Sequence, residues 1–274
     1  MKRSDFLLTL AGFGLTLFAA PSLFAESKKM SRKEFEEFLK SQVKTDENGD
    51  VYIDLKPPSQ DIIKKVRFVE KEESFPSGAI KMQKLRPGII SSAMLRWLCL
   101  YEPILNFEIY CKLLDEEEKK LEKERKKRER NAGKRYTQPK IEKKKPNKYS
   151  PVPPLVVEFL DKNDVGLRVM SFSKQTVIEK LKDGHPFLCY GGFRGDLEER
   201  NEKRKTFKNI LEWRDALSVI RKSKSSITSF GIRFITGFNE QSREFKMHDG
   251  IEKSYWITDD ELKDSCEVLI GIVL

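Results

Sequence analysis

The chain has 274 residues, of which 38% are hydrophobic and 35% are charged, and its formal net charge is +10. This composition is apolar enough to bury a core and polar enough to stay soluble, and the length allows one sizeable domain or two small ones. The basic charge belongs to one segment, because residues 119–148 hold 15 Lys and Arg against 4 Glu. The composition therefore excludes a positive field spread over the whole fold.

Residues 1–25 have the pattern of an export signal. Lys2 and Arg3 precede an uncharged apolar run at 6–20, and the small residue Ala25 stands before a polar stretch. The run is short for a membrane span, which needs about 20 apolar residues. We therefore expect an exported protein, periplasmic or extracellular, with residues 1–25 as a signal peptide. An uncleaved N-terminal membrane anchor is the alternative.

Residues 26–65 are predicted to form a helix-hairpin extension. Ser31-Arg32-Lys33-Glu34 has the spacing of a capping box at the start of a helix. Asn48-Gly49 is predicted to be the turn that joins this helix to a strand at 51–55. The acidic turn lacks the glycine and the bidentate glutamate that a calcium loop needs, so no calcium site is expected there.

The most apolar stretch after the leader runs from Pro87 to Leu114. Its apolar residues recur at three- and four-residue steps, which indicates a helix with little polar face, and such a helix is normally buried on most sides. Ser91 or Ser92 is expected to cap it. Pro103 should interrupt it, and a second apolar helix should follow at roughly 103–114. This helix pair is the expected heart of a domain at 66–274.

A basic insertion is predicted at 115–150. Its first half should continue the second apolar helix into solvent and should stop at 131–133. The insertion is either a solvated segment or a patch for an anionic polymer or lipid through residues 119–148. Aromatic residues for base stacking are nearly absent, which argues against specific nucleic-acid recognition.

After Pro154 the pattern predicts strands with one capped helix at 173–181. A second charged insertion at 194–224 should contain a further helix at 210–220. We expect an α+β fold in which N-terminal helices surround one buried helix that packs on a mostly antiparallel sheet. The strands predicted from apolar or alternating stretches lie at 155–160, 165–172, 184–192, 226–238, 244–247, 254–258 and 268–274.

This order of elements resembles the papain-like fold of the bacteriocin-processing type of cysteine peptidase and its exported bacterial relatives. The resemblance covers roughly residues 66–274 without the two charged insertions. It implies a papain-like domain whose partner is a peptide or protein ligand. The residues that carry the resemblance are Gly88-Ile89-Ile90, Ile178 to Pro186, Phe230 to Asn239 and Met247 to Gly250.

The chemistry of that family needs a thiolate at a helix N-terminus, a histidine base on a facing strand and an Asp or Asn that orients the ring. In the family's pattern the cysteine position is Ile90 and the histidine position is Gly231, whereas the orienting position is kept as Asp249. Neither isoleucine nor glycine carries a proton to transfer. We therefore expect a catalytically inactive domain that acts as a binding or interaction module. An active cysteine peptidase with a displaced site and an anionic-surface binder are the alternatives.

Four cysteines and two histidines limit other chemistry. The thiols of Cys99, Cys111, Cys189 and Cys266 allow three disulfide pairings in an exported chain, although three of them have apolar neighbours that are typical of free thiols. No pair has the close spacing of a zinc site, and no cofactor or metal is expected. On one strand His185 and Cys189 would lie about 13 Å apart, which is too far for a nucleophile and its base.

Overall fold

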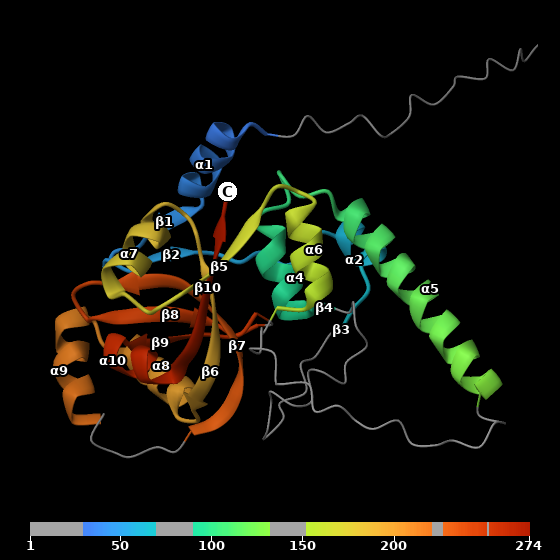
Figure 1. Cartoon of the computed structure of the whole chain (residues 1–274). Coiled ribbons are helices and arrows are strands. Elements are labelled where there is room, and N and C mark those ends of the chain that lie inside the picture. The colour runs from blue at the N-terminus through green and yellow to red at the C-terminus, as the bar shows by residue number, and fades with distance from the viewer. Residues whose placement is uncertain (1–29, 70–89, 132–151, 221–226, 251) are drawn as a thin grey trace, which may run out of the picture.

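The computed structural model describes residues 30–69, 90–131, 152–220, 227–250 and 252–274. These residues form an α+β fold in which a curled antiparallel sheet lies between two groups of helices (Figure 1). The predicted α+β class is confirmed.

Three predicted features fall outside the described residues. They are the export signal, the segment that opens the apolar helix at 87–89, and residues 132–150 of the basic insertion. Within the described ranges no helix combines the length and the apolarity that a membrane crossing requires.

The described helices are α1 (Arg32–Ser41), α2 (Gln60–Lys65), α4 (Ser92–Cys99), α5 (Phe107–Asn131), α6 (Pro154–Asp161), α7 (Lys174–Lys182), α8 (Leu197–Thr206), α9 (Ile210–Ile220) and α10 (Asp259–Ser265). The described strands are β1 (Val43–Thr45), β2 (Val51–Ile53), β3 (Phe68–Val69), β4 (Ile90–Ser91), β5 (Gly166–Met170), β6 (Phe187–Arg194), β7 (Ile227–Asn239), β8 (Glu244–His248), β9 (Ser254–Thr258) and β10 (Cys266–Val273).

The main sheet has β7 at its centre. Its strand order in the described residues is β1-β2-β7-β6-β10-β5, and β8 pairs with both β7 and β9. Every pairing in this sheet is antiparallel. A separate short pair, β3 with β4, is parallel and places Phe68 opposite Ile90.

The sheet has a hydrophobic core on each face, because successive side chains of a strand point to opposite sides. On β6, Leu188 and Tyr190 belong to the core beneath α4, α5 and α6. Phe187 and Cys189 belong to the other core, which α7 and α10 help to close. Figure 1 shows α4, α5 and α6 together on one side of the molecule.

Helix α4 is the predicted buried helix, although it is shorter than expected. Ser91 caps its start, since the Ser91 hydroxyl accepts a hydrogen bond of 3.1 Å from the Met94 amide. Trp97 packs on Phe234 of β7 with the ring centroids 5.9 Å apart. The predicted capping role of the serines at the helix start is thus confirmed for Ser91.

The second apolar helix begins later than predicted and continues into the charged tract as predicted. A turn at Tyr101–Ile104 separates α4 from α5, which starts at Phe107 and not at 103. The described part of α5 runs to Asn131, where the sequence predicts the helix to stop.

The run at 155–160 is a helix and not a strand. Pro154 stands at the start of α6, where its missing N–H costs nothing. Leu155, Val156, Phe159 and Leu160 are buried, and this spacing is one face of a helix. A short run that is apolar throughout has no period that separates strand from buried helix, which is why the prediction was wrong.

The Asn48-Gly49 turn joins two strands and not a helix to a strand. Helix α1 ends at Ser41, and Val43 then pairs with Ile53 in the hairpin of β1 and β2. Gly49 has φ +74, a left-handed conformation that glycine adopts without strain. The capping box of Ser31 with Glu34 is present as predicted.

Candidate functional site

Ile90, the predicted nucleophile position, is fully buried. Its side chain has 0% exposure, and its backbone forms a hydrogen bond with Tyr110 of α5. It pairs with Phe68 just before the start of α4. A side chain at this position packs in the core and does not reach a ligand.

Gly231, the predicted base position, faces the opposite side of the sheet from α4. Its neighbour Ile232 belongs to the same core as Ile90. Residues 231 and 233 share the other face, because side chains alternate along β7. Arg233 hydrogen-bonds there to Tyr255, and a Cβ added to Gly231 would lie 3.3 Å from Arg233 Nη1. The structure therefore does not bring the two predicted dyad positions together.

Asp249, the predicted orienting residue, does lie beside the start of α4. The adjacent Gly250 has φ +81, and a Cβ on it would lie 2.3 Å from the Cβ of Ala93. Only glycine permits this close approach of the loop to the helix. Asp249 Oδ1 accepts hydrogen bonds from the amides of Glu252 and Lys253, at 2.9 and 3.0 Å. The carboxylate thus holds the loop that follows β8.

A histidine and an arginine meet next to this loop. His248 Nε2 lies 3.3 Å from Arg96 Nη1 of α4, and His248 Nδ1 accepts a hydrogen bond of 2.7 Å from the Gly250 amide. Burial, followed by the charge of Arg96, lowers the pKa of His248 to about 4. The imidazole is therefore neutral at pH 7.

Sequence reasoning missed Arg96 and gave His248 no role beyond its place in the stretch from Met247 to Gly250. A signal was present, because Arg96 is the single charged residue between Ile89 and Tyr101. A lone charge in so apolar a helix marks the stripe that does not face the core.

Burial raises the pKa of three of the four thiols, those of Cys99, Cys111 and Cys189. Cys99 is the last residue of α4, and burial raises its pKa to about 12. Burial also raises the pKa of Cys189, whose side chain hydrogen-bonds to that of Cys266. Cys111 donates to the Lys65 carbonyl. Among the described residues none of these thiols hydrogen-bonds to an imidazole, so none has the partner that thiolate catalysis needs.

One hollow lies between α1, the segment after β2 and the end of α4. Its volume is about 600 Å³. Apolar side chains make up much of its wall, and Asp54, Lys56 and Glu102 contribute charges. The lining residues are Met30, Phe38, Gln42, Asp54, Lys56, Pro57, Ser59, Cys99, Leu100, Glu102 and Pro103.

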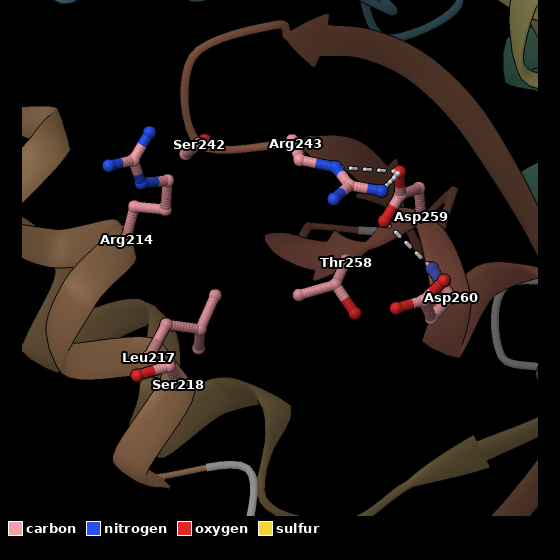
Figure 2. Close-up of a pocket in the computed structure, with 8 residues that line it drawn as sticks. All are labelled: Arg214, Leu217, Ser218, Ser242, Arg243, Thr258, Asp259 and Asp260. Carbon is pink, nitrogen blue, oxygen red and sulfur yellow. Dashed lines mark hydrogen bonds and ion pairs between the residues drawn. The ribbon is translucent and has the colours of Figure 1, made fainter.

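A smaller pocket of about 210 Å³ lies between α9 and the start of α10 (Figure 2). Figure 2 shows the guanidinium of Arg243 turned toward Asp259, with Nη2 3.1 Å from the carboxylate. Arg214 is paired with Asp215 at 3.2 Å. Both arginines of this pocket therefore already have carboxylate partners within the chain.

Helix α5 stands out from the body of the molecule along its second half (Figure 1). Between 119 and 131 it carries eight Lys and Arg against three Glu. The ion pairs described between residues 119 and 131 are local, such as Arg125 with Glu122 and Arg128 with Glu124. The described part of the basic insertion is thus a solvated helix with a net positive charge.

Within the described ranges no group of three His, Cys, Asp or Glu is placed to hold a metal ion. No family model matches the chain, and neither a curated protein nor a solved structure gives a significant match.

Proposed function

We propose that this chain is an exported binding module on a papain-like scaffold, without thiol catalysis. The observation that carries the proposal is the complete burial of Ile90 at the position where the resemblance requires a nucleophile. Two further features support the scaffold, whereas Gly231, on the face of the sheet opposite α4, does not. Helix α4 packs on β7 through Trp97 and Phe234, and the loop of Asp249 lies against the start of that helix.

The hollow beside α4 is the proposed ligand site. Its volume of about 600 Å³ lies in the range of about 300–1,000 Å³ that is usual for ligand sites. Phe38 and Leu100 give it an apolar wall, and Asp54 and Glu102 add carboxylates. Burial raises the pKa of Glu102, with a further contribution from Asp61. A short peptide with an apolar side chain fits this combination of an apolar wall and a few polar groups.

Two assays on the purified protein test the proposal. The first treats the protein with a peptide that bears a thiol-reactive warhead, and separately with casein. We expect no cysteine labelled faster than in the denatured chain and no casein fragments. Rapid labelling of one cysteine, or cleavage, would contradict the absence of thiol catalysis.

The second assay selects peptides from a random library on the protein and measures their affinity by fluorescence polarisation. We expect Leu100→Asp to reduce the affinity at least about tenfold, because it places a charge in the apolar wall. Val169→Asp is the matched control, since Val169 is 69% exposed on β5. Equal losses in both variants, or binding that survives Leu100→Asp, would place the ligand elsewhere.

A further inference from the structure

Two hydrogen-bond donors converge between α4 and β8. The 2.7 Å contact with the Gly250 amide makes His248 Nδ1 an acceptor. A neutral imidazole then carries its proton on Nε2. That N–H faces Arg96 Nη1 at 3.3 Å, and a guanidinium is a donor only. Both atoms in this contact are therefore hydrogen-bond donors, and the contact offers neither of them an acceptor.

The carboxylate nearest to this pair does not relieve the mismatch. Asp249 Oδ1 lies 3.7 Å from His248 Nδ1, on the other side of the ring, and accepts amides of its own loop. Within the described residues no carboxylate hydrogen-bonds to Arg96. Burial lowers the pKa of Arg96, and the nearby carboxylates of Asp249 and Glu252 offset this only in part.

We propose that Arg96 and His248 form a recognition site for an oxyanion of a ligand, either a carboxylate or a phosphate. One anionic oxygen can accept from both His248 Nε2–H and the guanidinium, and the planar guanidinium can engage a second oxygen. Arg96 is partly exposed, so a group in solution can reach it. The binding is non-covalent, and no proton has to move.

The charges around His248 set how the site responds to pH. Arg96 of α4 and Lys246 of β8 disfavour the imidazolium, whereas Asp249 and Asp54 favour it. An oxyanion at Nε2 adds a negative charge on the side of the His248 ring that now faces the positive charge of Arg96. Bound anion should therefore raise the pKa of His248 by about one unit or more.

This inference deepens the proposed binding function and rests on it, because it names the chemistry of one end of the ligand. Cys99, one helical turn beyond Arg96, lines the hollow beside α4. Asp54, which also lines the hollow, is close enough to influence the ring of His248. A peptide ligand in the hollow could thus present a carboxylate or a phosphate to the pair.

Proton NMR can test the site directly, because the chain has only two histidines. The C2 proton of His248 is followed from about pH 3 to about pH 8 with added acetate, inorganic phosphate or chloride at equal ionic strength. His185, whose ring stacks on Tyr101, is the internal reference. We expect acetate or phosphate, but not chloride, to shift the His248 resonance with saturation and to raise its pKa. Comparison of the acetate and phosphate arms distinguishes the two ligand groups.

Two variants make the result specific. Arg96→Gln should abolish the anion-dependent shift, and Arg96→Lys should retain part of it, since the charge remains but the planar fork is lost. An equal response to chloride, or an unchanged response in Arg96→Gln, would overturn the inference. The peptide assay with Leu100→Asp tests ligand binding in the hollow beside α4 independently of Arg96 and His248. Peptide binding without an oxyanion effect would therefore reject this inference and leave the proposed function standing.

Discussion

The outer half of α5 and helix α8 are both rich in Lys, Arg and Glu, yet the fold uses them in different ways. On α5 the charges stay in solvent and pair with residues three or four positions away, as Arg125 does with Glu122. On α8, Arg200 is buried and Arg204 is largely covered, and both pair with acidic residues from distant parts of the chain. The comparison shows that a charged segment can be either a solvated helix or a structural part of the core.

Arg204 shows how far the partners of α8 are spread. It donates to Asp50 at 2.6 and 2.9 Å and to Glu244 at 3.1 Å, and it stacks on Trp256 with 4.1 Å between the guanidinium carbon and the ring centroid. Glu244 also accepts from Trp213 Nε1 at 3.1 Å. This network ties α8 and α9 to the hairpin of β1 and β2 and to the edge of the main sheet.

Removal of the Arg204 charge should have the largest effect. Arg204→Met keeps most of the side-chain volume but leaves Asp50 and Glu244 buried without their cation. We expect the free energy of unfolding to fall by about 3–5 kcal/mol in urea titrations. The matched control on the same helix is Lys203→Met, because Lys203 is exposed and pairs only with Glu199. Equal losses in the two variants would show that the buried network does not distinguish α8 from a surface helix.

Acid should cost more stability through the buried contacts of α8 than through the exposed contacts of α5. Burial alone would raise the pKa of Glu261, but hydrogen bonds from Arg200 and Thr258 outweigh it and lower the pKa below 4.5. Because the folded pKa is the lower one, Glu261 contributes stability above about pH 4.5, and this contribution is lost as the pH falls through the folded pKa.

The measurement is the free energy of unfolding between about pH 6 and about pH 3. We expect Glu261→Gln to be less stable than the natural chain at the upper end and to depend less steeply on pH. The control is Glu124→Gln on α5, which should keep the natural slope. A slope in Glu261→Gln as steep as in the natural chain would assign the acid sensitivity to other groups.

The smallest effect is expected on α5. Arg125→Ala removes exposed pairs with Glu122 and Glu129, and exposed pairs of this kind contribute little to stability because water and salt screen them. We expect no change in the free energy of unfolding beyond the error of the urea titration, at low or at high salt. A loss comparable to that of Arg204→Met would mean that α5 packs on something beyond the described residues.

Elements whose signals are local were predictable from the sequence. The box of Ser31 with Glu34 and the Ser173 cap act over three residues, and both helices are present as predicted. Helix α9 has the predicted bounds of 210–220. Helix α10 was missed although Thr258 and Glu261 form a capping box, so its signal was local as well.

The candidate site was predicted less well. Asp249 lies beside α4 as the resemblance implies, but Gly231 faces the opposite core. Side chains alternate between the two faces of a strand, so a shift of one residue along β7 changes the face. Arg96 and His248 meet across 152 positions of the chain, and no local pattern links them.

The sequence by itself determined the helix caps, the turns and the α+β class, because these depend on hydrogen bonds and periodicities that span a few residues. Only the tertiary structure decided which charges are buried. Arg204 and Asp50 are 154 positions apart in the sequence. Their ion pair requires that the hairpin of β1 and β2 pairs with β7 and that α8 lies beside this hairpin. The local sequence of α8 differs little from that of α5, so burial had to come from contacts made by the rest of the chain.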